Sequence, residues 1–217
     1  QSLDQQRRVV LNEKLETESG PYGKLYEFKS RGCFPAEHPY AHTVIGEKSD
    51  LVAATLDDVK RWFRKWYTPS NAVLALCGDI DVASAREKVT HWFGDIPPGQ
   101  PVTRPENWIA DIPPQRRDRY QAKVASGTLL QVWNIPPVGS ADATLLSLAA
   151  DYLASGLSSE LVKNLVYGQK MASSVQAEIA DGELCSQLII SATVADGQTL
   201  AALERSLRDE VQRFLEE

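Results

Sequence analysis

Three histidines, His38, His42 and His91, are the side chains here best suited to bind a metal or move protons near neutral pH. His38 and His42 lie four residues apart, next to Glu37, and on a helix this spacing would place two imidazoles on one face, as zinc requires. Pro39 lies between them and disfavours a regular helix, and no third ligand is near in sequence. We therefore predict that this pair packs or forms hydrogen bonds in a loop. His91 has no acidic or cysteine partner at ligand spacing, which predicts a surface or boundary position.

The three cysteines, Cys33, Cys77 and Cys185, are far apart, and none forms a C-x-x-C pair of the kind found in zinc knuckles or thioredoxin-like proteins. Cys77 ends the apolar run 72–77, which predicts a buried small side chain. Whether Cys33 and Cys185 pair depends on the fold, so their pairing and the redox compartment stay open. No P-loop, Rossmann glycine fingerprint or G-x-S-x-G motif occurs in the chain.

Composition excludes several function classes. The chain has 217 residues with 23 Lys and Arg against 29 Asp and Glu, a net charge of −6, which gives no support to a nucleic-acid partner. Apolar residues make up 43%, but no run approaches the roughly 20 residues that cross a bilayer. The sequence opens at Gln1 inside a helix-like stretch without methionine, so we expect a piece of a longer protein.

The elements that must position these residues can be read from local patterns in the first half. Helices are expected over residues 3–18 and 22–32, followed by an irregular loop over 34–46. Thr55 and Asp58 resemble a capping box that starts an amphipathic helix. Its aromatic residues Trp62, Phe63, Trp66 and Tyr67 share one face and are predicted to be core rather than a stacking platform. Residues 71–77 are predicted to form a buried strand and residues 82–93 a helix.

The second half begins after a proline-rich stretch and has a different pattern. We predict domains over 1–100 and 118–217, joined by a Pro-rich linker over 101–117. The second domain is predicted to have the order ββααββα. Its strands are expected at 120–125, 128–135, 173–180 and 184–194, with a hairpin turn at Asp181-Gly182, and its helices at 141–155, 158–168 and 198–217.

A helix carrying the carboxylate Glu13 opens a series of short landmarks. Alone, Glu13 would be read as a solvent-exposed acid, but it ends the run Arg8-Val9-Val10-Leu11-Asn12-Glu13. This run is followed by further landmarks, in order: His38-Pro39-Tyr40, Val44-Ile45-Gly46, Asp50-Leu51, Asp58-Val59, Trp66-Tyr67-Thr68-Pro69-Ser70-Asn71-Ala72-Val73, Gly78-Asp79-Ile80-Asp81 and Phe93-Gly94-Asp95-Ile96-Pro97. Over nearly the whole chain their order and spacing resemble the pitrilysin/insulinase (M16) zinc metallopeptidases.

The resemblance implies an α+β fold, with antiparallel or mixed sheets and helices packed on one face, and Glu13 as the third zinc ligand. In that family a His-x-x-Glu-His helix supplies two zinc-binding histidines and the glutamate that activates water. That motif is absent from this chain, and Gln6 stands where the family often has another glutamate. The predicted helix over 145–152 also lacks the zinc motif, and Val166 and Ser173 replace an Arg and a Tyr that contact substrate in many members.

The resemblance therefore implies the later part of a zinc-bearing domain and the first part of a non-catalytic one. We expect a parent zinc metalloendopeptidase that hydrolyses peptides in an enclosed chamber. This chain alone is expected to be inactive, with no catalytic residue of its own and no bound Zn²⁺. Its expected partners are peptide substrates, the remaining domains of the parent or a partner subunit, and a second copy through uncovered sheet edges. The resemblance is compatible with a periplasmic parent.

Two alternatives belong to other function classes. The chain could be a non-catalytic M16-like partner or assembly subunit, which Gln6 favours and Glu13 disfavours. It could also be a complete peptide-binding α+β module. A His-x-x-Glu-His motif upstream of Gln1 in the parent would favour the enzyme over both.

Overall fold

The computed structural model describes residues 2–112 and 116–216. The chain forms two compact units, one made of residues 1–11 and 46–105 and the other of residues 12–45 and 106–217. We call these the first and second unit. The predicted domain boundaries stay a prediction, and residues 113–115 of the predicted linker lie outside the described residues.

The second unit contains a three-stranded antiparallel sheet in the order β1-β3-β2. Its strands are β1 (Thr128–Ile135), β2 (Ala172–Ala180) and β3 (Ser186–Val194). Ile189 on β3 lies opposite Val132 on β1 and Glu178 on β2. This sheet confirms the α+β class. The strand predicted at 120–125 is wrong, because this segment has no strand partner among the described residues to satisfy its main chain.

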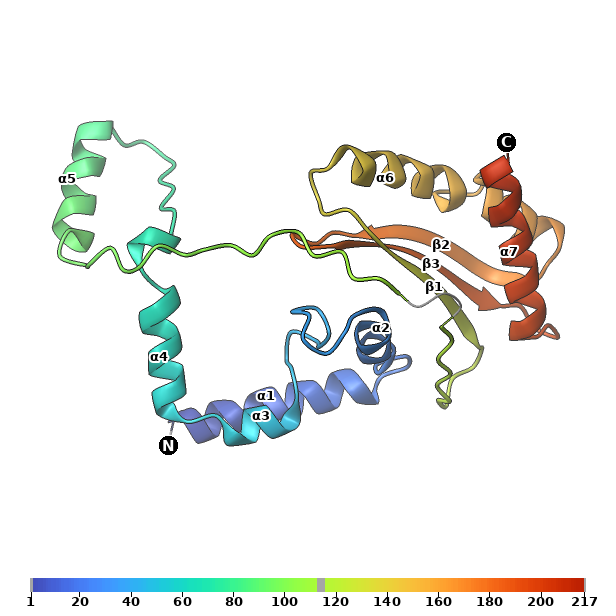
Figure 1. The fold of residues 1–217 in the computed structure, drawn as a ribbon, viewed down its shortest axis with the longest axis horizontal. Coiled ribbons are helices and arrows are strands. Elements are labelled where there is room, and N and C mark those ends of the chain that lie inside the picture. Colours follow the sequence, from blue (N-terminus) through green and yellow to red (C-terminus); the bar gives the residue numbers. More distant parts are fainter. Residues whose placement is uncertain (1, 113–115, 217) are drawn as a thin grey trace. The chain divides into compact units, whose positions relative to one another are not determined.

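Three helical elements cover one face of this sheet. They are α6 (Ala141–Ala154), the π-helix η2 (Val162–Gly168) and α7 (Leu200–Glu216). Figure 1 shows α6 along this face and α7 crossing its end. The buried side chains between the layers are Leu153, Ala154, Leu161, Leu165, Ala172, Val175, Ile190, Ala192, Leu203 and Leu207. These apolar residues form the main core of the second unit.

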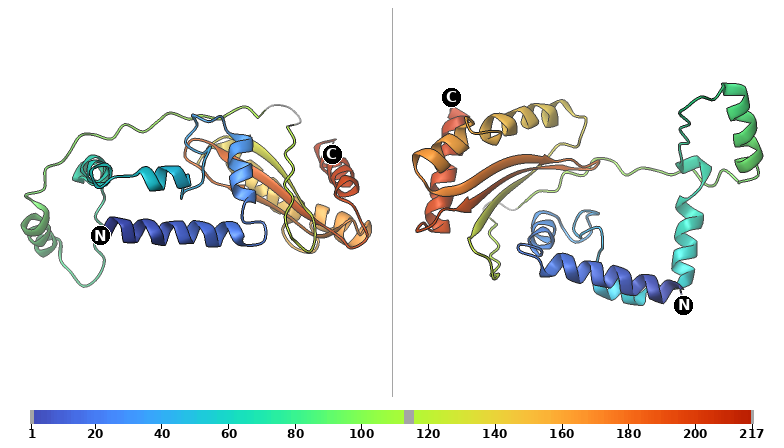
Figure 2. Two further views of the ribbon diagram at one scale, coloured as in Figure 1. Left: turned by 90° about the horizontal axis from the view of Figure 1, so that it is seen from below. Right: turned by 180° about the vertical axis from the view of Figure 1, so that it is seen from behind.

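The opposite face of the sheet is covered by α2 (Leu25–Cys33) and the loop that follows it. Figures 1 and 2 show α2 and α6 on opposite sides of the strands. A smaller apolar cluster lies here, made of Cys33, Phe34, Ala41, Ala110 and Cys185. The predicted helix and loop at 22–46 are thus confirmed in kind, with the helix starting three residues later.

The first unit is built from short helices. They are the start of α1 (Ser2–Ser19), α3 (Lys48–Ala53), α4 (Leu56–Trp66), the 3-10 turn η1 (Pro69–Asn71) and α5 (Val82–Phe93). The Arg7 guanidinium donates to the carbonyls of Leu51 (2.8 Å) and Ala54 (2.6 Å) and so joins α1 to α3. The capping box is confirmed: the Thr55 hydroxyl accepts from the Asp58 N–H, and the Asp58 carboxylate accepts from the Thr55 N–H.

Three predictions for this unit are wrong. Residues 72–77 form no strand (Figure 2), Cys77 is exposed, and the aromatic face of α4 is not core. Trp62 and Tyr67 are 59% and 70% exposed. The physical reason is common to all three: among the described residues, the first unit has no sheet against which this face could pack.

No helix among residues 2–112 and 116–216 is long and apolar enough to span a membrane.

Candidate functional site

Glu13 lies on the part of α1 that belongs to the second unit, and its side chain is exposed. No residue of α1 is buried. Within the described part of the chain, Glu13 has no hydrogen bond or ion pair, whereas Lys14 bridges to Glu18 at 2.7 Å. Its carboxylate is therefore free of internal partners, and its predicted role as a zinc ligand stays a prediction.

His38 is a buried loop residue, only 1% exposed, whose two ring nitrogens are both used. The Tyr40 N–H donates to Nδ1 (3.0 Å), and Nε2 lies 2.9 Å from the Trp108 carbonyl oxygen. Since Nδ1 accepts, Nε2 must carry the proton and donate, which assigns the neutral tautomer. The ring stacks on Phe34, with centroids 4.5 Å apart, and lies 4.4 Å from the Trp108 ring. His38 is thus a packed, hydrogen-bonded loop histidine, as expected, with no free lone pair for a metal.

The amide of Asn134 joins the segments around this histidine. Its Nδ2 donates to the carbonyls of Cys33 and Ala110, each at 2.8 Å, and its Oδ1 accepts from Gln187 (2.9 Å). The Tyr40 hydroxyl accepts from the Leu184 N–H (3.2 Å). Four segments distant in sequence are therefore fixed by one amide and one tyrosine. Sequence reasoning missed these residues, because their partners are far away along the chain.

The two thiols of this region are buried and free. Burial raises the pKa of Cys33, and the nearby Lys29 ammonium partly offsets this shift. Burial likewise raises the pKa of Cys185. Raised values favour the neutral thiol, which is a poor nucleophile and a poor metal ligand. Neither cysteine therefore has the character of a catalytic residue.

The described residues do not fit a zinc ion by themselves. They contain no group of three or more His, Cys, Asp or Glu side chains that could hold a metal. His42 is exposed, with Nδ1 3.0 Å from the Thr43 carbonyl oxygen, and His91 is exposed beside the Trp92 ring. A zinc site needs three or four converging ligands, so no catalytic step can be assigned to a metal held by this chain alone.

Glu210 on α7 is the one carboxylate buried among the described residues, at 5% exposed. It accepts from Asn164 Nδ2 and Gln169 Nε2, each at 2.7 Å, and from Arg213 (2.8 Å). Asn164 lies inside the π-helix η2, and its carbonyl accepts from the Gln169 N–H. A buried acid in a cleft is a common sign of catalysis. Here three donors satisfy the carboxylate, so it fastens η2 to α7.

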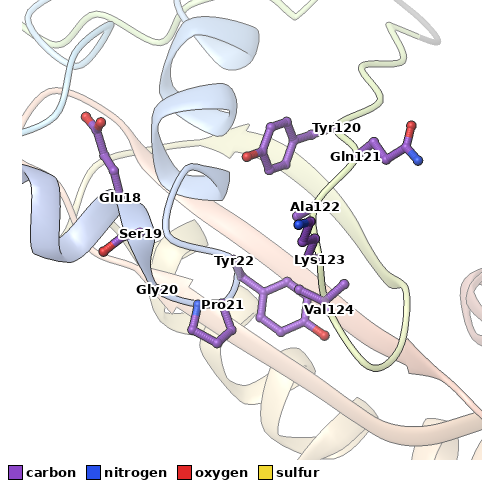
Figure 3. Close-up of a pocket in the computed structure, with 10 residues that line it drawn as sticks. All are labelled: Glu18, Ser19, Gly20, Pro21, Tyr22, Tyr120, Gln121, Ala122, Lys123 and Val124. Atoms are coloured by element: carbon purple, nitrogen blue, oxygen red, sulfur yellow. The ribbon is translucent and has the colours of Figure 1, made fainter.

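An open pocket of about 360 Å³ lies in the second unit between residues 18–22 and 120–124. Figure 3 shows the ring of Tyr22 near Pro21 and Val124, with the Glu18 carboxylate turned away. Tyr22 has a left-handed backbone (φ 63°), and its hydroxyl donates to the Ser126 carbonyl (2.7 Å). The lining offers neither a histidine nor a cysteine, and it contains no nucleophile paired with a base.

Comparison with known families identifies the group of proteins to which the chain is similar. Residues 53–217 match the family described as the Peptidase M16 inactive domain. The chain belongs to this family. The family match covers the part of the chain that follows Glu13 and the His38 loop, and it reaches through the whole sheet of the second unit.

Relatives and solved structures agree with this assignment. The chain is 35% identical to the zinc protease PqqE of Helicobacter pylori over 77 residues. These residues make up 35% of this chain and 17% of that protein. A crystal structure of a peptidase M16 inactive domain from Pseudomonas fluorescens shares the fold, with TM-score 0.81 and 17% identity over 100% of this chain and 52% of that one. The crystal structure of a protease from Helicobacter pylori gives TM-score 0.75 and 21% identity. The match covers 97% of this chain and 52% of that one. The chain thus spans about half the length of these solved structures, and its match covers a smaller share of the curated relative.

Proposed function

We propose that this chain is a fragment of a zinc-dependent metalloendopeptidase and hydrolyses no peptide by itself. It would span the end of the zinc-bearing domain and the start of the following non-catalytic domain. One observation carries the proposal: residues 53–217 match the peptidase M16 inactive domain. The described residues, which provide no set of three converging metal ligands, are compatible with it. The zinc protease PqqE among the relatives supports a peptidase as the complete protein. In that protein, the substrates would be peptides held in an enclosed chamber.

The sheet of the second unit supports a role in holding peptides. The strand order leaves β1 and β2 each with one side unpaired among the described strands. An extended peptide can add to such an edge through main-chain hydrogen bonds, with low demand on its sequence. Binding without bond cleavage is the contribution that suits an inactive domain.

Within this proposal, Glu13 is one zinc ligand of the complete protein, and two histidines come from outside this chain. Its exposure and its lack of an internal partner support this role. Glu16 provides a matched control, because it is an exposed glutamate on the same helix.

The test compares the 217-residue chain with the complete parent protein, each with added Zn²⁺, on a quenched fluorescent peptide. We expect hydrolysis by the parent only. In the parent, Glu13→Gln should abolish activity and lower the zinc content measured by atomic absorption, whereas Glu16→Gln should leave both unchanged. Zinc-dependent hydrolysis by the chain alone would refute the proposal. Full zinc content and activity in the Glu13→Gln parent would refute the role of that residue.

The second candidate is a non-catalytic partner or assembly subunit. Gln6 favours it, because a glutamine at this place cannot act as a carboxylate. A parent without a His-x-x-Glu-His motif, and without hydrolysis in the same assay, would decide for this candidate.

A further inference from the structure

The loop after α2 is held in place by a histidine whose hydrogen bonds require a neutral ring. His38 is 1% exposed, and its Nε2 donates to the Trp108 carbonyl across 2.9 Å. Its Nδ1 accepts from the Tyr40 N–H at 3.0 Å. A main-chain N–H can only donate, so this second bond needs an Nδ1 that carries no proton. The closed form of the loop is therefore specific for the neutral imidazole.

A proton on Nδ1 acts against the closed loop in two ways. The Tyr40 N–H loses its acceptor, and two N–H groups then point at each other over the 3.0 Å that the hydrogen bond spanned. The ring also becomes a cation inside a cluster of aromatic and apolar side chains. A buried charge is costly unless a group of opposite charge pairs with it.

The acids of the segments around His38 are not in a position to pair with this cation. Both ring nitrogens face main-chain groups, so neither faces a carboxylate. The acids on the neighbouring segments are all exposed, and they are Glu37, Glu106, Asp111, Asp181 and Glu183. Exposed charges interact only weakly with a buried one, because water screens them.

The other titratable groups of this region do not favour the cation either. Tyrosine and cysteine side chains ionise above about pH 8, so Tyr40, Cys33 and Cys185 are neutral in acid. Burial raises the pKa of both thiols further. Lys29 on α2 and the exposed His42 are positive in acid, which opposes a further positive charge nearby.

The aromatic rings offset only part of this cost. The Phe34 ring stacks on the imidazole at 4.5 Å and 22°, and the face of an aromatic ring attracts a cation. The rings of Tyr40 and Trp108 lie 5.2 and 4.4 Å away but are turned by 62° and 49°. One ring face does not replace a lost hydrogen bond and the hydration of a charge. Protonation therefore favours the open loop, in which water reaches the ring.

We propose that His38 makes the loop after α2 an acid-sensitive cover of the sheet, which opens when Nδ1 takes up a proton. A histidine in water takes up a proton near pH 6.5. Because the open loop binds this proton and the closed loop does not, the open population rises as pH falls below about 6.5. Opening brings the buried Cys33 and Phe34 into water. The inference is independent of the peptidase assignment, because it needs neither zinc nor Glu13.

The test follows hydrogen exchange of the Tyr40 amide in the 217-residue chain by NMR, corrected for the exchange rate of an unstructured peptide. The equilibrium constant for opening should be about 30-fold larger at pH 5 than at pH 7.5, because each pH unit below about 6.5 adds a factor of about ten. The amide of Ile190, in the central strand β3, should exchange more slowly than Tyr40 at every pH. This difference would show that the loop opens without unfolding of the sheet.

His38→Gln removes the titrating group and keeps a side chain that can donate and accept. This variant should open more often than the natural chain at pH 7.5, and its opening constant should no longer depend on pH between 5 and 7.5. The matched control is His42→Gln, which changes an exposed histidine of the same loop and should keep the 30-fold response, about that of the unchanged chain.

Nitrogen-15 NMR of the imidazole in the unchanged chain needs no variant. In the closed loop it should show a proton on Nε2 and none on Nδ1, also at pH 5. A closed loop with protons on both nitrogens would overturn the proposal. An opening constant that is the same at pH 5 and pH 7.5, or an equal pH response in His38→Gln, would overturn it too. Equal exchange of Tyr40 and Ile190 would show that acid unfolds the whole second unit, which would also refute a cover that opens by itself.

Discussion

At the scale of single residues, His38 shows how a candidate ligand is used for structure instead. Both ring nitrogens are hydrogen-bonded and three aromatic rings surround the imidazole. A metal would have to displace the Tyr40 N–H or the Trp108 carbonyl, each of which would then lose its hydrogen bond to the ring. The ring thus holds the loop after α2 against the segment that contains Trp108.

We predict that His38→Ala destabilises the second unit by about 2–4 kcal/mol, because it leaves two main-chain groups unpaired and opens a space between aromatic rings. Urea unfolding followed by tryptophan fluorescence would measure the loss. His42→Ala, at an exposed position, should change stability by less than about 0.5 kcal/mol. Equal effects of the two substitutions would contradict this account.

The cysteines give a second prediction at this scale. Iodoacetamide should label Cys77 first, and Cys33 and Cys185 only after unfolding or at alkaline pH, as followed by peptide mass spectrometry. Burial raises the pKa of both slow thiols. The unfolded chain therefore ionises first as pH rises, so stability falls between the ordinary thiol pKa and the raised value. Stability that rises with pH across this window would contradict the assignment.

At the scale of elements, the π-helix depends on α7. Its widened turn leaves Asn164 and Gln169 pointing their amides toward Glu210. π-Helices are rare and need outside support, since their hydrogen-bond geometry is strained. One carboxylate from α7 supplies that support.

Glu210→Ala should therefore cost about 1–3 kcal/mol, because the half-buried amide of Asn164, the amide of Gln169 and the Arg213 guanidinium lose their common acceptor. Amide hydrogen exchange should show the loss first in η2. Glu210→Gln keeps one acceptor oxygen and should lose less. Asp209→Ala changes an exposed neighbour and should cost less than about 0.5 kcal/mol. A fully stable Glu210→Ala variant would show that η2 is held by its apolar contacts alone.

Local sequence patterns predicted many helices and strands, but they did not predict contacts between residues that are far apart in the sequence. The Thr55 and Ser140 caps and the apolar spacing of α7 lie within a few residues, so their helices could be predicted. The β2–β3 hairpin was also predicted, although its connection spans residues 181–185. By contrast, Trp108, which accepts a hydrogen bond from His38, is 70 residues away in the sequence. No local pattern predicts this contact. Residues 71–77 read as a strand because side-chain pattern reports what a segment would bury, not whether a partner is present.

At the scale of the whole molecule, the two units differ in what holds them together. The second unit contains both apolar clusters, whereas no described residue of the first is buried. Elements with few buried contacts open at low free-energy cost. Stability is therefore concentrated in the second unit.

Limited trypsin digestion should accordingly cut within residues 56–105 before it cuts within 128–216. Mass spectrometry of the first fragments would locate the cuts. Early cleavage after Lys163, Lys170 or Arg205 would show that the second unit is not the stable part.

The long-range hydrogen bonds of Asn134 and Tyr40 have a consequence for the nascent chain during synthesis. Asn134 reaches Cys33 across 101 residues, and Leu184 reaches Tyr40 across 144. A ribosome adds ~5–20 residues per second, so the loop after α2 waits on the order of ten seconds for its contacts to be synthesised. Throughout that interval the Cys33 thiol and the ring of Phe34 stay in water, open to chaperones and oxidants. Translation speed therefore sets how long these two side chains, buried in the folded protein, stay exposed.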